Sequence, residues 1–390
     1  MAEILIISPS DLEKDPRVRR HIEVAEEFGR VTTCGYGQKS LNQIRHLEVP
    51  PAVRFISRSV ITLLMMQFGL HQTAARRSGF YKEAKQAIEA LETSFDCVLV
   101  NDFHALQVAR DLFHPSKIWV DMHEYAPGEG DHDWRWRIAL KRHIKNLCLR
   151  HLNDVRVVSS VGNAICKQYE QDLRRDVTLL INASPFFDKS KTRKRTFVSD
   201  YQVHLVHVGV AIRARHLENM ILAAQAHPDV FLHLYILPTE RQYFEEIFNL
   251  CKSITNVCIE EALQVDEIIP QISQFDAGVI AIPPTNFNYE NGLPNKLFQY
   301  IQARLPIITG PLAEIAEIVA CEGIGIVISD FSVAAIASGY EEFKAVDKET
   351  FEEPLDRAAE KYSVERQNMI RREIFASMLS SLKSNQETIE

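Results

Sequence analysis

The sequence lacks the long apolar run that a membrane-spanning helix requires. No stretch of about 18 apolar residues occurs in its 390 residues. Its first ten residues, MAEILIISPS, lack the basic start and the long apolar centre of a signal peptide and instead predict a buried strand. We therefore expect a cytoplasmic protein.

Paired cysteines and an excess of positive charge are also missing. The seven cysteines are scattered, with no CxxC pair and no Cys/His spacing of a zinc site, which predicts reduced, buried thiols and no bound metal. A net charge of −8 gives no reason to expect nucleic-acid binding. The string Asp131-His132-Asp133 follows a glycine-containing loop and not an apolar strand, so we assign no metal to it.

The composition is that of a globular protein, and the length suffices for two domains. Apolar residues make up 46% and charged residues 25% of the chain. Strand-like and helix-like segments alternate through both halves, which predicts an α/β fold of two doubly wound, Rossmann-like domains. We expect a first domain over 1–182, a polar and basic linker over 183–200, and a second domain over 201–363.

The stretch from 278 to 310 has the most regular pattern in the chain. An apolar run, Gly278 to Ile282, predicts a buried parallel strand, and a polar loop follows it. Pro294 suits the first position of a helix, and Pro306 ends that helix before a second apolar run begins. The order of strand, polar loop, helix and strand is that of a βαβ unit.

Such a unit directs backbone N–H groups and the positive end of a helix dipole toward any anion above the sheet. Lys296, one turn into the helix, adds a full positive charge, while Asn295 and Gln299 offer polar groups to hydroxyls. The alternative is an ordinary βαβ unit whose polar loop is merely solvated.

One segment in this stretch resembles a known family. PNKLFQYIQARLPIITG is similar to the PNKLFEYMAAGKPVIAS segment of retaining glycosyltransferases with the GT-B fold, of the family-4 kind. The resemblance implies two Rossmann-like domains that face each other across a cleft, with the last helix, about 364–390, crossing back to the first domain. It also implies a nucleotide-diphosphate sugar as donor substrate, with no cofactor and no metal.

Three further segments resemble the same family. VDMHE implies that His123 touches the transferred sugar, and GVAIRARHLENMILAA implies that Arg215 grips the donor diphosphate. Arg213 is a second candidate, because Val210 stands where the family often has an arginine. The turn that ends at Leu263 falls where the family's backbone contacts the base.

The chain also departs from the family pattern. Two glutamates that the family places eight residues apart are Asn291 and Gln299 here, with Glu290 adjacent to the first, and Ser8-Pro9-Ser10 replaces a Gly-Gly pair. The resemblance implies His123, Arg215 and Lys296 as catalytic residues. It implies the following donor-binding residues: Arg213, Leu263, Glu290, Asn291, Gly292, Leu293, Pro294, Asn295 and Gln299.

Two regions are both basic and apolar. Trp134 to Asn153 contains six basic residues and no acid, with an apolar stripe at helical spacing, and residues 54–85 combine an apolar run with several arginines and lysines. Either these helices contact an anionic membrane surface or an anionic acceptor, or they pack between domains with a solvated basic face.

These observations favour a retaining glycosyltransferase that acts on a glycan or a lipid-linked acceptor. The setting would be cell-surface polysaccharide or glycolipid synthesis at the inner face of the membrane. The alternative is a non-catalytic GT-B protein that binds a nucleotide sugar or another protein, which the Gln299 departure would explain. A sugar-nucleotide epimerase on the same fold needs acid/base carboxylates that the sequence does not clearly supply.

Overall fold

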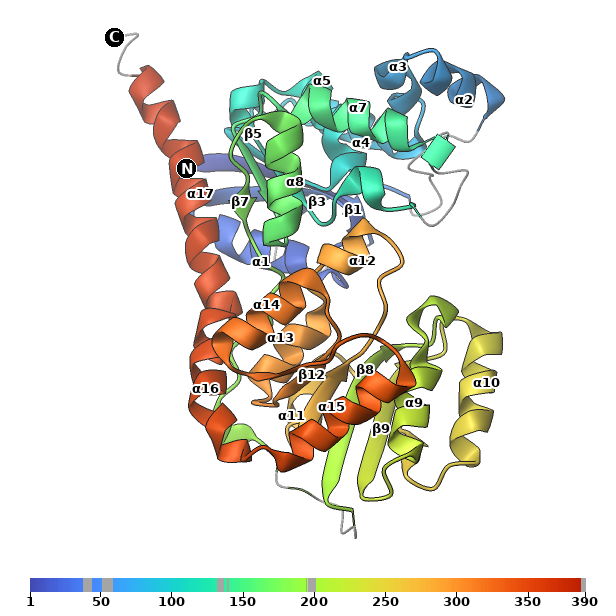
Figure 1. The fold of residues 1–390 in the computed structure, drawn as a ribbon. Coiled ribbons are helices and arrows are strands. Elements are labelled where there is room, and N and C mark those ends of the chain that lie inside the picture. The colour runs from blue at the N-terminus through green and yellow to red at the C-terminus, as the bar shows by residue number, and fades with distance from the viewer. Residues whose placement is uncertain are drawn as a thin grey trace. The chain divides into compact units, whose positions relative to one another are not determined.

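The computed structural model describes residues 1–37, 44–50, 59–131, 137–138, 140–193, 195 and 201–386. The chain forms two compact units (Figure 1). Unit 1 comprises Met1–Ile181, Asn286–Asn288 and Asn368–Glu390, and unit 2 comprises Asn182–Thr285 and Tyr289–Gln367.

Unit 1 is built on a parallel sheet of seven strands in the order β3-β2-β1-β4-β5-β6-β7. The strands are β1 (Ala2–Asp11), β2 (Gly29–Tyr36), β3 (Arg45–Glu48), β4 (Cys97–Asn101), β5 (Ile118–Met122), β6 (Val157–Ser160) and β7 (Thr178–Leu179). Its helices are α1 (Pro16–Glu26), α2 (Val60–Gln67), α3 (His71–Ala75), α4 (Gly79–Glu89), α5 (Leu106–Leu112), α7 (Lys141–Leu152), α8 (Asn163–Leu173) and most of α17 (Val364–Gln386).

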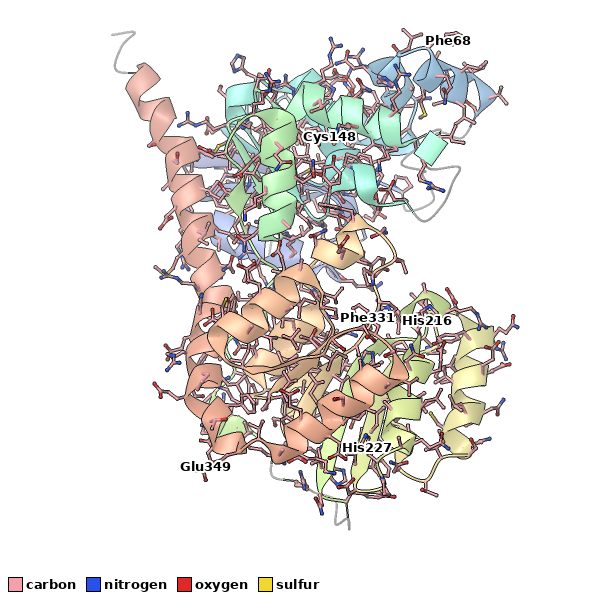
Figure 2. The ribbon with its side chains drawn as sticks, in the orientation of Figure 1. Phe68, Cys148, His216, His227, Phe331 and Glu349 are labelled. Carbon is pink, nitrogen blue, oxygen red and sulfur yellow. The ribbon has the colours of Figure 1, made fainter. Side chains whose placement is uncertain are left out.

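Alternation along β1 divides the core of unit 1 between the two faces of the sheet. Ile4 and Ile6 pack with α1 and with Phe375 of α17, while Leu5 and Ile7 face the core under α4, α5, α7 and α8. The two helical layers can be followed in Figure 1, and Figure 2 marks Cys148 of α7 within the second of them. Residues 368 onward therefore complete a core that begins at the N-terminus.

Unit 2 is built on a parallel sheet of six strands in the order β10-β9-β8-β11-β12-β13. The strands are β8 (Val203–Val210), β9 (Val230–Leu237), β10 (Val257–Ile259), β11 (Ala277–Ile280), β12 (Ile307–Thr309) and β13 (Gly325–Val327). The helices are α9 (Leu217–Gln225), α10 (Arg241–Lys252), α11 (Ile268–Ile272), α13 (Asn295–Gln302), α14 (Ala313–Glu322), α15 (Val333–Ala345) and α16 (Glu352–Lys361), with α12 (Phe287–Asn291) beginning in unit 1 and ending in unit 2.

Both strand orders reverse once, as in doubly wound Rossmann sheets. The reversal falls between β1 and β4 in unit 1 and between β8 and β11 in unit 2. Ligands of such sheets bind at the carboxyl ends of the strands beside the reversal. The prediction of two Rossmann-like α/β domains is confirmed.

Two local features depend on backbone geometry. The strand expected at the start of the chain, β1, reaches Asp11 through a shift in its pairing with β2. Three helices, α2, α3 and α4, lie within 59–94, and Gly69, with a positive φ of 78°, separates α2 from α3. Within the linker, residues 194 and 196–200 lie outside the described part of the chain.

Among the described helices, none combines the length and the apolar character needed to cross a membrane.

Candidate functional site

Four residues converge at the carboxyl end of β8 in unit 2. His207 and Gly209 belong to β8, Arg215 follows it in a short 3₁₀ turn, and Lys296 lies in the first turn of α13. A Cβ placed on Gly209 would lie 3.0 Å from His207 Nε2, 3.1 Å from Lys296 Nζ and 3.3 Å from an Arg215 Nη1. Three nitrogen-bearing side chains therefore surround the one position in this strand that carries no side chain.

Packing on the sheet holds Lys296 in this place. Gly278 of β11 lies directly under the ring of Tyr300, where a Cβ would come within 2.4 Å of ring carbon. The Tyr300 hydroxyl accepts a hydrogen bond of 3.0 Å from the Val208 amide. Since Tyr300 stands one turn after Lys296, this contact fixes the start of α13 above β8.

The electrostatics of the cluster favour an anion. Burial, and then the nearby charge of Arg215, lower the pKa of Lys296 well below its usual value. Its Nζ lies 3.3 Å from His207 Nε2, while His207 Nδ1 lies 2.9 Å from the Val279 carbonyl. Nδ1 therefore carries the proton and Nε2 accepts from Lys296.

Burial, followed by the charge of Lys296, also lowers the pKa of His207 well below its usual value. Arg215 Nε is buried and finds no hydrogen-bond partner among the described residues. Lys296 is buried and Arg215 is partly buried, and neither pairs with a carboxylate among the described residues, which is costly unless a negative ligand completes the site.

The N-terminus of α13 adds backbone donors on the same side. Pro294 is the N-cap in extended conformation, and no side chain caps the helix. The Asn295 side chain is exposed and accepts a hydrogen bond of 2.9 Å from Asn182. A helix start without a side-chain cap presents N–H groups and a positive dipole end to an anion.

The structure does not bring Arg213 into this cluster. Its guanidinium pairs with the Glu246 carboxylate of α10, at 2.6 and 2.7 Å, and lies over the Tyr243 ring. Of the remaining predicted donor residues, Leu263 follows β10 and Gln299 lies in α13. Glu290 and Asn291 end α12, and Gly292, Leu293 and Pro294 lie between α12 and α13. Glu290 is exposed, and the following are partly buried: Leu263, Asn291, Gly292, Leu293, Pro294 and Gln299.

In unit 1, His123 follows β5 and lies beside a buried charge network. Its Nε2 lies 3.9 Å from an oxygen of Asp121 and is buried without a hydrogen-bond partner among the described residues. Asp121 accepts hydrogen bonds from Arg17, His21 and Ser159, at 2.6 to 2.8 Å. The network fixes the end of β5, and with it the backbone from which His123 projects.

Three carboxylates surround the segment after His123. The pKa of Glu129 is raised to about 7. Desolvation of its carboxyl group is the larger cause, and the negative charges of Asp102 and Glu124 are the next. The Asn288 amide donates to a Glu124 oxygen at 3.0 Å and accepts from the Tyr125 amide at 2.9 Å. Sequence reasoning missed Asn288, because its role depends on a contact between residues more than 160 positions apart.

The basic region that was predicted as one helix over Trp134–Asn153 is helical in α7, and residues 132–136 and 139 lie outside the described residues. Lys141 pairs with Asp131 at 2.7 Å and Lys145 with Asp172 at 2.9 Å, both within unit 1. The apolar stripe of α7 is buried in the core of the same unit. This stripe is therefore not available to a membrane.

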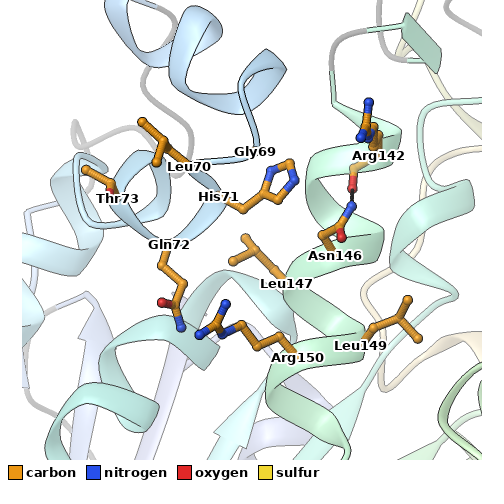
Figure 3. Close-up of a pocket in the computed structure, with 10 residues that line it drawn as sticks. All are labelled: Gly69, Leu70, His71, Gln72, Thr73, Arg142, Asn146, Leu147, Leu149 and Arg150. Carbon is orange, nitrogen blue, oxygen red and sulfur yellow. Dashed lines mark hydrogen bonds between the residues drawn. The ribbon is translucent and has the colours of Figure 1, made fainter.

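A pocket of about 610 Å³ lies between α7 and the residues that follow α2. Figure 3 shows His71 pointing toward α7, and Arg150 of α7 pointing toward Gln72. The lining residues are Gly69, Leu70, His71, Gln72, Thr73, Arg142, Asn146, Leu147, Leu149 and Arg150. Two arginines make this pocket basic.

An exposed apolar patch adjoins the pocket. Its members are half or more exposed and are Val60, Ile61, Leu64, Phe68 and Leu70. Phe68, at 78% exposure, ends α2 at the outer side of unit 1 (Figure 2). Residues 51–58, which include the first part of the predicted basic region 54–85, are outside the described residues.

No protein-family model matches the sequence, and no curated protein sequence matches it. Solved structures do match the fold along nearly the whole chain. The sucrose-phosphate synthase of Thermosynechococcus elongatus aligns with a TM-score of 0.72 at 14% identity, over 98% of this chain and 100% of that one. The fold is GT-B.

Two other GT-B structures are similar. A glycosyltransferase of Rickettsia africae ESF-5 aligns with a TM-score of 0.70 at 12% identity, over 97% of this chain and 98% of that one. The Anabaena protein HepE, solved in complex with UDP and glucose, aligns with a TM-score of 0.65 at 15% identity, over 97% of this chain and 100% of that one. The GT-B fold thus extends through both units.

Proposed function

We propose that this protein is a glycosyltransferase that moves a sugar from a nucleotide-diphosphate sugar to an acceptor hydroxyl. The convergence of Lys296, Arg215 and His207 around Gly209 carries the proposal. HepE, with which this chain shares its fold, was solved with UDP and glucose, and this supports a nucleotide-sugar donor.

The charge set matches the needs of the reaction. In sugar transfer the bond between the anomeric carbon and the diphosphate oxygen breaks, and negative charge builds on the diphosphate. Lys296, Arg215 and the amides at the start of α13 are fixed before the reaction, so they can stabilise that charge without rearranging. The acceptor oxygen forms the new bond to the anomeric carbon, and its proton passes to an oxygen of the leaving diphosphate.

We further propose that transfer occurs with retention and without a metal ion. Lys296, Arg215 and a helix N-terminus supply the positive charge that a metal supplies elsewhere. Retention requires attack on the face from which the diphosphate leaves, and this diphosphate is the base in the step described above. No other base is then needed at the anomeric carbon.

We assign His123 to the transferred sugar and the nearby carboxylates to hydroxyl groups. His123 has an unpartnered Nε2 at the end of β5, and Asp102 and Glu129 offer acceptor oxygens close by. Hydroxyl groups donate readily to such oxygens. A glycan or lipid-linked acceptor of a cell-surface polysaccharide or glycolipid pathway fits this chemistry.

We also propose that unit 1 binds an anionic membrane surface through the apolar patch and the basic pocket. Exposed Phe68 and Ile61 can enter the interface while Arg142 and Arg150 bind lipid headgroups. In this proposal the apolar side chains that enter the membrane come from α2 and not from α7. A lipid-linked acceptor would reach the protein by the same route.

The experiment measures thermal stabilisation of the full chain by UDP-, GDP-, ADP- and CMP-sugars. A donor at about 100 times its Kd should stabilise the native state by about 2.7 kcal/mol. We expect one nucleotide to raise the midpoint in the wild type, and Lys296→Ala and Arg215→Ala each to abolish the shift. Exposed His216→Ala, in the same segment as Arg215, is the matched control and should keep it.

The scaffold alternative makes a different prediction. Gln299 replaces a carboxylate that the family uses for ribose hydroxyls, and this favours weakened or lost turnover. Transfer to an acceptor and hydrolysis of the donor both release nucleotide diphosphate, which can be assayed. Donor binding without any such release would support a binding protein. Gln299→Glu should then increase donor affinity.

A further inference from the structure

A second cluster of chemically reactive side chains lies on the same sheet, outside the donor site. His233 of β9 and Cys258 of β10 are register partners in a parallel pair, so their side chains project from the same face. Glu260 follows two positions after Cys258 and shares that face. A histidine, a thiol and a carboxylate therefore meet at the edge strand of unit 2.

Their ligand atoms are already close together. His233 Nδ1 lies 2.6 Å and Cys258 Sγ 2.9 Å from the same oxygen, Glu260 Oε1. Cys258 Sγ lies 3.5 Å from His233 Nδ1. All three atoms fall within 4.8 Å of one another. In the metal-free protein the thiol and the imidazole N–H both donate to that oxygen.

These separations approach those of a tetrahedral zinc site. Zinc bonds of about 2.0–2.3 Å to nitrogen, oxygen and sulfur place the ligand atoms about 3.3–3.6 Å apart. The sulfur-to-nitrogen distance fits without change. The two distances to Glu260 Oε1 must increase by roughly 0.6 Å, which a partly exposed glutamate side chain can do by rotating about its own bonds.

The surroundings orient the histidine as metal sites require. His233 Nε2 lies 2.9 Å from His204 Nδ1, so the ring has a partner on the side away from the cluster. A metal-bound histidine usually donates its other N–H to such a partner, which fixes the tautomer. The rings of Phe231 and Phe275 lie 4.7 and 4.6 Å from that of His233 and keep it in place.

We propose that His233 Nδ1, Cys258 Sγ and the Glu260 carboxylate bind a zinc ion, with water as the fourth ligand. Binding breaks the S–H bond of Cys258, forms a zinc–thiolate bond and releases the thiol proton to solvent. His233 exchanges its Nδ1 proton for one on Nε2, and His204 carries its own proton on Nε2 so that its Nδ1 accepts; the number of protons on each ring is unchanged. Nothing is oxidised or reduced. Glu260 is a third exposed and β10 is an edge strand, so the ion can enter from solvent.

The zinc ion acts on the structure of unit 2. It joins β9 to the end of β10 and fixes Glu260, the residue that precedes the loop 261–263. That loop contains Leu263, a predicted contact of the nucleotide base. The inference does not depend on the proposed function, because the ligands are the chain's own and metal binding can be measured without any donor.

The experiment titrates Co²⁺ into the full chain after removal of metals by a chelator. Cobalt reports a thiolate ligand through a sulfur-to-metal charge-transfer band in the near ultraviolet. We expect one equivalent of Co²⁺ to produce this band, and Zn²⁺ to displace it. Cys258→Ser should lose the band, whereas Cys321→Ser, which removes an exposed cysteine, should retain it. Glu260→Gln should weaken binding at least tenfold.

A second measurement needs no variant. Zinc should slow alkylation of Cys258 in the wild type and leave alkylation of Cys321 unchanged, as mapped by mass spectrometry. A cobalt complex without a thiolate band, or equal alkylation of Cys258 with and without zinc, would overturn the proposal. A band that persists in Cys258→Ser would show adventitious binding at another thiol and would overturn it as well.

Discussion

Arg17 donates two hydrogen bonds to the carboxylate of Asp121, one from Nε at 2.6 Å and one from Nη2 at 2.7 Å. Both side chains are buried. Arg17 also donates to the Leu180 carbonyl at 2.9 Å. Arg371 of α17 is fully buried nearby, and burial followed by the charge of Arg17 lowers the pKa of Arg371 to about 9. The Asp121 carboxylate is thus the negative charge closest to Arg17 of α1, and it also acts on Arg371 of α17.

Asp121→Asn should destabilise unit 1 by about 3–5 kcal/mol, because it leaves buried Arg17 without its counter-charge. Burial alone would raise the pKa of Asp121, but the charge and hydrogen bonds of Arg17 and His21 together outweigh it and hold the pKa well below its usual value. The stabilisation is therefore present above about pH 4 and is lost as the pH falls through the lower, folded pKa. All three tryptophans belong to unit 1, so their fluorescence in urea measures its unfolding.

Glu27→Gln is the control for this prediction. It removes the surface pair between Glu27 and Arg372, which joins the end of α1 to α17, at 2.7 Å. Both side chains are nearly half exposed, so the urea midpoint should stay close to that of the wild type. A loss as large as that in Asp121→Asn would contradict the assignment of the stability to the buried network.

Gly209→Ala should weaken donor binding about tenfold or more while leaving the unfolding temperature of the free protein nearly unchanged. The new methyl group would occupy the space among Lys296, Arg215 and His207, at 3.0–3.3 Å from their nitrogens. Isothermal titration with the nucleotide that stabilises the wild type measures the effect. Unchanged affinity in Gly209→Ala would mean that the diphosphate binds elsewhere.

Donor binding should take up protons at pH values between the lowered pKa of Lys296 in the free protein and its pKa in the complex. Burial and Arg215 lower the pKa of Lys296 in the free protein, and a bound diphosphate raises it again. Between these two pKa values the complex holds a proton that the free protein lacks, so the affinity falls as the pH rises. Titration calorimetry in buffers of different ionisation enthalpy counts these protons. Lys296→Met should bind the donor at least 100-fold more weakly and take up none.

Glu129 should contribute less to the stability of unit 1 as the pH rises from about 4.5 to about 7. Its pKa is raised from 4.5 to about 7 in the folded protein, so this group binds more protons in the folded state across this range, whereas buried His21 and His143, whose pKa values are lowered to about 4, act in the opposite direction. The difference in unfolding free energy between the wild type and Glu129→Gln, measured by tryptophan fluorescence in urea, should therefore decrease as the pH rises. Glu26→Gln, on the exposed side of α1, should keep the slope of the wild type.

Binding to vesicles should depend on α2. Ile61→Ser with Phe68→Ser should reduce cosedimentation with vesicles of phosphatidylcholine and phosphatidylglycerol at least tenfold, because these side chains supply the exposed apolar area. Phe248→Ser removes a comparably exposed aromatic residue from unit 2 and should bind like the wild type. Binding should weaken in high salt, since Arg142 and Arg150 contribute through charge. Equal binding by all variants would contradict the assignment.

Local signals predicted much of the fold. The apolar run Gly278 to Ile282 was predicted as a buried parallel strand, and β11 covers Ala277–Ile280. Pro294 was placed at the start of a helix, and it is the N-cap of α13. Such features depend on neighbours in sequence, through capping groups, apolar runs and prolines, and these can be identified from one chain.

Contacts between distant segments could not be predicted. The sequence left open whether the basic stripe of α7 contacts a membrane or an acceptor or is a solvated face, and it did not indicate that Lys145 pairs with Asp172, 27 positions away. The role of His207 depends on Lys296, 89 positions away. His233 and Cys258 were not recognised as a pair. They lie on adjacent strands but 25 residues apart in sequence, and the short ligand spacings of sequence motifs do not cover such a pair.

The position of α17 has a consequence for biosynthesis. Phe375 and Met378 complete the core of unit 1, whose other segments end at Ile181 and Asn288. Roughly 190 residues separate Ile181 from this helix, and at about 5–20 residues per second a ribosome needs about 10–40 seconds to make them. During that interval the nascent chain lacks the helix that covers part of one apolar face of its first sheet. Of the two units, unit 1 is thus the first to be started and the last to be completed.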